Sequence, residues 1–288
     1  VTKIWNASRF VQMNLDGYVP GPAAAVTPED AWMLSRLARA TEAATRQLEG
    51  YEFGDYARDL QSFFWGDVCD WYIELCKGRL LDGEGEERLQ VQRNLVFVLD
   101  TCMRLLHPVM PFVTESVWDA LPASGLDGHD AQFLMVAAWP ERLAAFVDER
   151  AEGDFELAKR VVSCVRSTRA RYRLSPKAEL AASVRCSDAD ASVLLGQEAF
   201  IRSVGRISAL ACGPGAQKPA GAVSAADGSL EIFVDLGGLV DLAAESARLS
   251  KELAKAEKDL AAVERTLSNE GFVAKAAPAV IQKKRDQQ

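Results

Sequence analysis

The sequence predicts a mainly α-helical protein in three parts: a helical bundle over residues 1–150, a small α+β module over 151–241, and an antiparallel coiled-coil hairpin over 242–288. Three observations support this prediction. Apolar stripes with helical spacing fill the first half of the chain. Short segments of β-forming residues follow in the second part. From Leu249 to Leu267, apolar residues recur at alternating steps of four and three, which is the pattern of a coiled-coil seam.

The first part should form an up-and-down bundle, because four or five helical segments are joined by short links. The clearest helix start is Thr27-Pro28-Glu29-Asp30, where threonine caps the helix, proline takes the first position and acids fill the first turn. The helices are expected at Lys3–Leu15, Thr27–Leu48, Phe53–Lys77, Glu86–Leu106 and Thr114–Leu121, with an extended apolar piece at Phe133–Trp139.

The second part changes character, with a basic helix followed by strand-like segments. The helix has the sequence KRVVSCVRSTRARYR. Strands are expected at Leu180–Arg185, Arg206–Cys212 and Leu230–Leu236, with a helix near Asp188–Ile201 and a loop at Pro214–Gly221. This mixture predicts a small α+β module.

The third part begins with a strong helix, which Ser268-Asn269-Glu270-Gly271 should end. Apolar spacing resumes at Val280 and Ile281, so a return helix is expected to complete an antiparallel hairpin. The return segment is short, and we expect a truncated hairpin in which the root of the seam has no partner from this chain. The root would then be mobile, docked on the body or paired with a second molecule.

Charge separates this rod from the rest of the chain. Residues 248–288 hold nine Lys/Arg and six Asp/Glu, a net charge of +3. Because the whole chain carries -8, residues 1–247 carry -11. A basic rod on an acidic body favours an arm that faces a polyanion. A structural spacer or dimerisation helix is the alternative, since heptads by themselves indicate only pairing with another helix.

Several classes of protein are disfavoured by composition. No apolar run is long enough for a transmembrane helix, and the start, VTKIWNASRF, lacks the layout of a signal peptide and an initiator Met. We therefore expect a cytoplasmic protein and a chain cut from a longer one. The six cysteines form no C-x-x-C pair, and only two histidines occur. With no phosphate loop or G-x-S-x-G either, no catalytic residue, metal ligand or cofactor is expected.

Features suited to nucleic-acid binding are better represented. Arg9 lies beside Asn6 on the first helix, and Trp32, Arg36 and Arg39 share one face of the second helix. An exposed aromatic ring beside arginines can stack on an unpaired base and hold its phosphate. The alternative is that Trp32 belongs to the core and that the arginines form a solvated face.

A second set of arginines follows in the basic helix of the module. Arg166, Arg169 and Arg173 share a helical face, and Arg171 lies between them in the sequence. This set could contact RNA phosphates or form salt bridges within the protein. We expect Arg166 and Arg169 to point outward, with Tyr172 and Leu174 packed.

Several segments, in the same order, resemble the anticodon-binding bundle of class I aminoacyl-tRNA synthetases: KIWNASRF, DAWMLSRL, FFWGDVCDWYIEL, HPVMPFVTESVW and AAWP. Within that class the chain is most similar to valine–tRNA ligases. The run LSNEGFVAKAAPAVI is similar to the tip and return of their C-terminal coiled-coil arm. The resemblance covers essentially the whole chain.

The resemblance implies a function in tRNA recognition: the bundle binds the anticodon loop and the arm binds the outer corner of tRNA(Val). It also implies that the parent enzyme attaches valine to tRNA(Val), with ATP and Mg in a catalytic domain that carries HIGH and KMSKS motifs. Neither motif occurs here, so this chain should be inactive alone. The missing catalytic and editing domains are expected partners, in a monomeric parent without membrane association.

The site residues follow partly from the resemblance and partly from spacing. The resemblance puts anticodon contacts on Arg9, Trp32 and Arg36, with Trp32 as the ring that stacks on the anticodon loop, and the neighbouring Asn6 and Arg39 are added to them. It also puts contacts with the outer corner of the tRNA on the arm, at Lys251, Lys255, Lys258 and Arg265, whereas further backbone contacts are expected from the shared helical face of Arg166, Arg169 and Arg173.

Two alternatives remain. The equivalent region of isoleucine–tRNA ligase shares the bundle, but many of those enzymes carry a C-terminal zinc ribbon, for which no C-x-x-C pair is present. A helical scaffold or dimerisation protein with a coiled-coil tail would self-associate and ignore tRNA.

Overall fold

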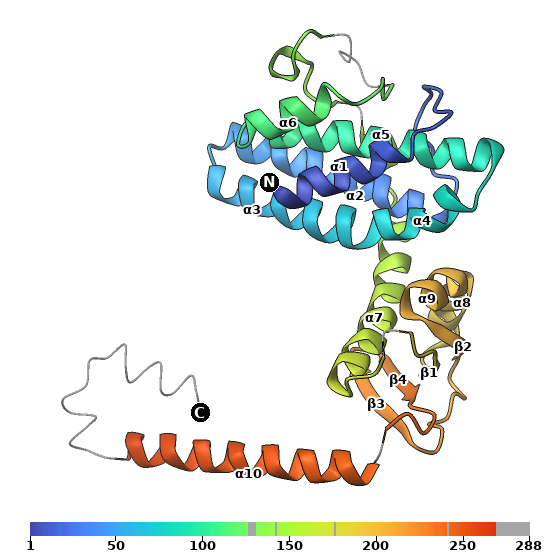
Figure 1. The fold of residues 1–288 in the computed structure, drawn as a ribbon, viewed down its shortest axis with the longest axis vertical. Helices are drawn as coiled ribbons and strands as arrows, with labels where there is room; N and C mark the ends of the chain where they lie inside the picture. The colour runs from blue at the N-terminus through green and yellow to red at the C-terminus, as the bar shows by residue number, and fades with distance from the viewer. Residues whose placement is uncertain (126–130, 142, 176, 241, 269–288) are drawn as a thin grey trace.

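A computed structural model describes residues 1–125, 131–141, 143–175, 177–240 and 242–268. The fold is mainly helical with one small sheet, which confirms the predicted fold class for the bundle and the α+β module. Figure 1 shows a helical bundle, a smaller α+β module beside helix α7, and the long helix α10 leading away from the module. The bundle and α10 extend to the same side, so the molecule has the outline of an open bracket. Within the described residues, no helix is both long and apolar enough to cross a bilayer.

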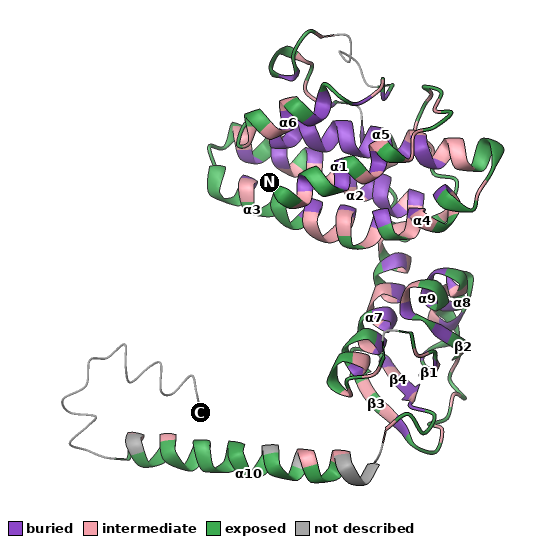
Figure 2. Ribbon diagram, in the orientation of Figure 1, coloured by how far each residue is buried: buried purple, intermediate pink, exposed green. Residues whose placement is uncertain are grey.

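The bundle is organised around α5, which is buried along most of its length, as its apolar faces predicted (Figure 2). Helices α2, α3, α4 and α6 pack around it. The elements are α1 (Thr2–Met13), α2 (Pro28–Glu49), α3 (Phe53–Ser62), η1 (Phe63–Tyr72), α4 (Ile73–Leu81), α5 (Gly85–Leu106), α6 (Pro111–Trp118), η2 (Leu134–Val136) and η3 (Leu143–Phe146).

Helix α2 starts with the predicted cap. The Thr27 side chain accepts a hydrogen bond from the Asp30 N–H, and the Asp30 carboxylate accepts one from the Thr27 N–H. Asp30 is fully buried and also accepts bonds from the Tyr72 hydroxyl at 2.8 Å and from Arg79 at 2.9 and 3.0 Å. One capping residue thereby ties α2 to η1 and α4.

The single helix predicted over Phe53–Lys77 is helical throughout but not α-helical throughout. Its middle, η1, is a π-helix. The apolar spacing in this stretch fits an ordinary helix, because a local change to i→i+5 hydrogen bonds leaves little trace in such a pattern.

Two further predictions need correction near α6. The helix starts at Pro111, earlier than the predicted Thr114, because proline fits the first position of a helix. The piece Phe133–Trp139 was expected to be extended, but it contains the 3-10 turn η2. The Leu134 N–H donates to the Glu115 carboxylate at 2.8 Å, which holds this turn against α6.

The module contains four strands in the order β2-β1-β4-β3. Strands β1 and β2 are parallel, and the other pairs are antiparallel. Three strands lie where the sequence predicted them. The predicted helix near Asp188–Ile201 is two helices, α8 and α9. The elements are α7 (Glu149–Arg171), β1 (Leu180–Arg185), α8 (Asp188–Gly196), α9 (Glu198–Gly205), β2 (Ile207–Cys212), β3 (Ala222–Asp227) and β4 (Leu230–Asp235).

Strand β3 was missed by the sequence analysis. It forms an edge of the sheet, and its sequence, AVSAAD, offers few large apolar side chains because most of it is not buried. The Asp227-Gly228 pair that opens its hairpin to β4, with Gly228 at φ +56°, was the available signal.

The outgoing helix of the rod is present as α10 (Leu242–Leu267), close to the predicted span. Two residues of its seam, Leu253 and Leu260, are 61% and 39% exposed, so both remain largely open to solvent in the described part of the chain. The stop at residues 269–271 and the return helix with Val280 and Ile281 lie outside the described residues.

An aromatic stack joins the bundle to the module. The ring of Trp32 in α2 lies 4.1 Å from that of Phe155 in α7, which lies 4.7 Å from that of Phe200 in α9. Trp71 meets both phenylalanines edge-on. Because Trp32 is 0% exposed, the prediction that it stacks on an RNA base is wrong, and the core alternative holds.

A second buried carboxylate, Asp100 of α5, fixes α6 and the chain that follows it. It accepts hydrogen bonds from Arg104 Nε at 2.8 Å, from Trp118 Nε1 at 2.8 Å and from the Ser124 hydroxyl. Asp100 is 0% exposed and Arg104 4%, so neither charge has water as an alternative partner.

We expect Trp32→Ala to lower the free energy of unfolding by about 3–5 kcal/mol, because it leaves a large cavity beneath Phe155. Urea denaturation followed by circular dichroism measures this loss. The matched control is Trp5→Ala, whose ring is half exposed on α1 and should change stability by less than about 0.5 kcal/mol. Equal stability of the two variants would contradict the buried position of Trp32.

We expect Asp100→Asn to cost about 3–5 kcal/mol of unfolding free energy, because it leaves the buried Arg104 without its counter-charge. Asp119→Asn, on the exposed end of α6, is the control and should be nearly neutral. The same denaturation experiment compares the two, and a loss common to both would refute the role of Asp100.

Candidate nucleic-acid interface

Helix α1 presents an exposed face that suits RNA. Asn6 and Arg9 are exposed as predicted. Trp5, one turn before Arg9, is 49% exposed, although the sequence analysis did not select it. The Arg9 side chain makes no hydrogen bond or ion pair with any described residue. These three residues, the α1 face, therefore combine an accessible ring, an amide and an unpaired guanidinium.

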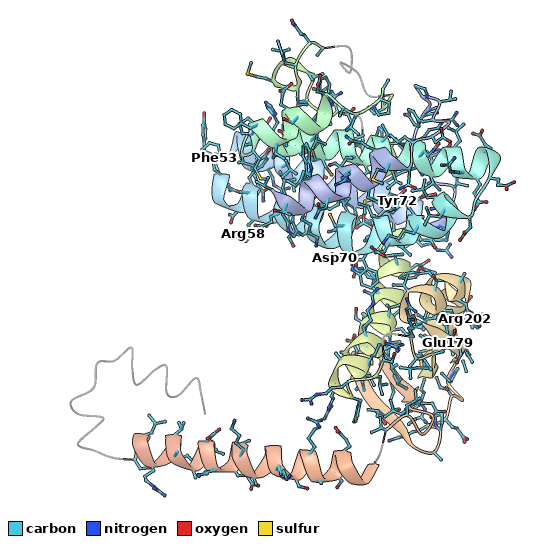
Figure 3. All side chains as sticks on the ribbon, viewed as in Figure 1. Phe53, Arg58, Asp70, Tyr72, Glu179 and Arg202 are labelled. Carbon is cyan, nitrogen blue, oxygen red and sulfur yellow. The ribbon has the colours of Figure 1, made fainter. Side chains whose placement is uncertain are left out.

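The start of α1 is anchored to the bundle. Lys3 Nζ donates to the Asp70 carboxylate at 2.6 Å and to the Trp65 carbonyl at 3.1 Å. Figure 3 shows Asp70 on the side of the bundle that is turned towards α7 and α10. The anchored end of α1 thus lies at the concave side of the bracket.

The arginines of α2 have a different setting from those of the α1 face. Arg36 Nε donates to Asp67 at 3.0 Å, and Arg39 pairs with Glu149 at 2.8 Å. Both line a cavity of about 550 Å³ between α2, η1 and α7, together with Trp71 and Lys159. Their charges are matched within the protein, so they are weaker candidates for RNA than Arg9.

Trp71 does not replace Trp32 as a stacking ring. The Lys159 ammonium lies 5.5 Å from its centroid and the Arg166 guanidinium 5.0 Å. Lys159 also lies 5.2 Å from the Trp32 ring and forms an ion pair with Asp67 at 3.6 Å. These cation–π contacts stabilise the joint between bundle and module.

The predicted arginines of α7 and of the turn after it differ in exposure. Arg166 is exposed, as predicted, although its head covers Trp71. Arg169 does not point outward, which corrects that prediction: its guanidinium donates to the carbonyls of Ala178 at 2.6 Å, Ser175 at 3.1 Å and Gly205 at 3.2 Å. Its pKa is lowered by burial and then by the neighbouring Arg206. Arg173 is exposed, and its side chain forms no hydrogen bond or ion pair with a described residue.

Tyr172 and Leu174 are half-buried and packed against the core, as expected. Tyr172 lies beneath the Arg171 guanidinium, 5.8 Å from the ring centroid. The end of α7 therefore carries cations on its outside and apolar packing on its inside.

On α10 the four predicted cations Lys251, Lys255, Lys258 and Arg265 are all exposed. None pairs with a carboxylate in the described part of the chain. Lysines that repeat along one solvated helix without acidic partners suit contact with a polyanion.

Thiol chemistry is disfavoured at the cysteines. Burial raises the pKa of Cys69 to about 11 and that of Cys212 to about 12. These thiols stay protonated at neutral pH, so they are poor nucleophiles and metal ligands. The described residues contain no group of three or more His, Cys, Asp or Glu side chains arranged to hold a metal.

Two protein families and several curated proteins match this chain. Residues 30–184 match the anticodon-binding domain of tRNA ligase, and residues 241–288 match the valyl tRNA synthetase tRNA binding arm. Valine–tRNA ligases from Halalkalibacterium halodurans, Thermotoga maritima and Geobacillus stearothermophilus are 40%, 37% and 36% identical to this chain, over 98%, 99% and 98% of its length. The chain spans about a third of the length of these relatives: 32%, 31% and 32%.

The two family matches cover different parts of the fold, and the first of them crosses from the bundle into the module. The first match covers most of the bundle and continues through α7 into β1, and the second covers α10. The resemblance drawn from the sequence motifs is thereby confirmed. The chain belongs to the anticodon-binding family of tRNA ligases, and it aligns with the C-terminal part of valine–tRNA ligases.

Proposed function

We propose that this chain holds tRNA(Val) at two distant places, with the α1 face on the anticodon loop and α10 on the outer corner of the L-shaped RNA. The observation that carries the proposal is the distribution of free cations. Arg9 and the four α10 cations have no carboxylate partner among the described residues, whereas Arg36, Arg39 and Lys159 do. An RNA ligand supplies the missing counter-charge.

The α1 face supplies the kinds of contact that an unpaired loop requires. The Trp5 ring offers a surface for stacking, Arg9 can pair with a phosphate or base edge, and the Asn6 amide can donate and accept. Because single-stranded bases expose both their faces and their edges, this combination suits an anticodon loop better than a duplex.

The arm supplies contacts of another kind. We assign α10 as the outgoing helix of an antiparallel coiled-coil hairpin, since Leu253 and Leu260 lie on an exposed apolar seam that a second helix would cover. Its polar face carries the exposed lysines. Such a surface recognises backbone phosphates and not base sequence.

The parent enzyme attaches valine to tRNA(Val) in this proposal. Since the chain spans 32% of its relative, catalysis belongs to the remaining part, together with ATP and Mg²⁺. This chain contributes RNA recognition, and the catalytic and editing domains are its partners.

We expect Trp5→Ala to weaken binding of an anticodon stem-loop with the valine anticodon by about 1–3 kcal/mol, which is the usual loss for one stacked base. Arg9→Ala should weaken it as well and lower the salt dependence, because one phosphate contact disappears. Fluorescence anisotropy over a series of salt concentrations measures both effects.

The matched control is Phe53→Ala, at the start of α3 (Figure 3). Phe53 is 56% exposed, close to the exposure of Trp5, but it lies outside the α1 face. This control should bind like the parent. Unchanged binding by both α1 variants, with their circular dichroism intact, would show that the anticodon contact is elsewhere.

We expect the triple variant Lys251→Gln, Lys255→Gln and Lys258→Gln to weaken binding of full-length tRNA and to leave the isolated stem-loop unaffected. The slope of log K against log salt should fall by about two to three units, because up to three phosphate contacts are lost. Glu257→Gln, on the same helix, is the control and should not weaken binding. A protein that self-associates and binds neither RNA would favour a scaffold role.

A further inference from the structure

The corner between α7 and α10 carries exposed cations that have no role in the proposed function, and among them only Arg173 was predicted from the sequence as a tRNA contact. Arg171 ends α7, Arg173 and Lys177 lie in the turn after it, and Arg206 ends α9 nearby. We call these four residues the basic elbow. All four are exposed, and none of their side chains forms an ion pair with a carboxylate in the described residues.

The elbow is a single surface, because hydrogen bonds bring its segments together. Arg169 donates to carbonyls of the turn after α7, at Ser175 and Ala178, and also to Gly205 at the end of α9. The Leu180 N–H donates to the Arg206 carbonyl at 3.2 Å. The end of α9 is therefore held beside the turn after α7.

Two of these arginines occupy positions that normally belong to glycine. Arg173 and Arg206 both have φ +51°. At Arg173 the chain makes a helix-ending turn, in which the Leu174 N–H donates to the Arg169 carbonyl and the Arg173 N–H to the Ala170 carbonyl. Glycine makes this turn without strain, so the arginine side chains are not needed for the backbone conformation.

Carboxylates around the elbow do not balance its charge. Among the described side chains, Glu179 in the turn after α7 and Glu245 in the first turn of α10 are the acidic residues on the segments next to the elbow. Glu245 already pairs with Arg248, which lowers its pKa, with weaker contributions from Arg173 and Arg171. In the described part of this corner, four exposed cations and the half-buried Arg169 thus outnumber two carboxylates, in a chain whose net charge is -8.

We propose that the basic elbow binds the phosphate backbone of a double-helical RNA stem, as a third contact between those of the α1 face and α10. The elbow presents no exposed aromatic ring for stacking, since Tyr172 is half-buried beneath Arg171, and arginine and lysine alone read backbone. Figure 1 shows the end of α7 between the bundle and α10. An RNA that contacts both the α1 face and α10 passes the basic elbow. The inference rests on the proposed function.

A purely structural role is the competing explanation: Arg171 and Arg173 could serve only to hold Glu245 and so fix the direction of α10. The two explanations differ in the effect of Glu245→Gln. If the arginines only dock the helix, removing the carboxylate is as harmful as removing the arginines. If the arginines bind phosphate, removing the Glu245 carboxylate relieves its competition with the RNA.

The experiment measures binding of the 288-residue chain to a tRNA(Val) transcript and to its isolated anticodon stem-loop over a range of salt. The elbow variant combines Arg171→Gln, Arg173→Gln and Arg206→Gln. We expect about tenfold or greater loss for tRNA and a salt slope lower by about two to three units, since each lost phosphate contact removes about one. The stem-loop should bind as before, and Glu245→Gln should bind tRNA as tightly as the parent or more tightly.

Arg173→Gly separates binding from stability. It removes one cation and relieves the left-handed backbone, so its melting temperature should equal or exceed that of the parent, while its affinity for tRNA falls. A loss of affinity in this variant therefore cannot come from unfolding.

If the parent binds both RNAs and the elbow variants bind tRNA as tightly as the parent does, the elbow does not bind phosphate. The proposed function would still hold in that case. Equal losses in Glu245→Gln and the elbow variant would also overturn it, in favour of helix docking. If the parent binds neither RNA, the proposed function fails and the elbow fails with it.

Discussion

The contact between Trp32, Phe155 and Phe200 is the interaction on which the rest of the arrangement depends. These rings come from α2, α7 and α9, so one stack connects the bundle with the helices that cover the sheet. Aromatic rings bury large apolar areas in a preferred geometry, and Lys159 and Arg166 add cation–π contacts at the rim. The joint gives the α1 face a defined position relative to the module, and hence to the root of α10.

The cations of this chain fall into two classes that sequence spacing cannot separate. Arg36, Arg39, Arg104 and Arg169 are engaged by carboxylates or carbonyls of the protein. Arg9, Arg173 and the lysines of α10 are exposed and have no such partners among the described residues. Because a paired guanidinium must first give up its internal partner, the second class is better prepared to meet phosphate. The acidic surplus of the body, by contrast, disfavours RNA over most of the surface.

The candidate site shows how one buried ring can mislead a prediction. Trp32 and Trp5 both lie beside arginines at helical spacing, and both are compatible with stacking on a base. In the fold, Trp32 faces α7 and is fully buried, whereas Trp5 faces water. The spacing of a tryptophan relative to its own helix cannot reveal whether a distant helix will cover it, and Phe155 lies far along the chain.

The sequence by itself determined the helical bundle, three of the four strands, the cap of α2 and the long helix α10, because each depends on local periodicity, capping or turn chemistry. Its motifs were also sufficient for the family. Only the tertiary structure decided what depends on contacts between distant segments: the π-helical middle of Phe53–Leu81, the edge strand β3, the burial of Trp32 and the internal use of Arg169. The physical reason is that hydrogen-bond partners and burial are properties of packing, which local sequence constrains only weakly.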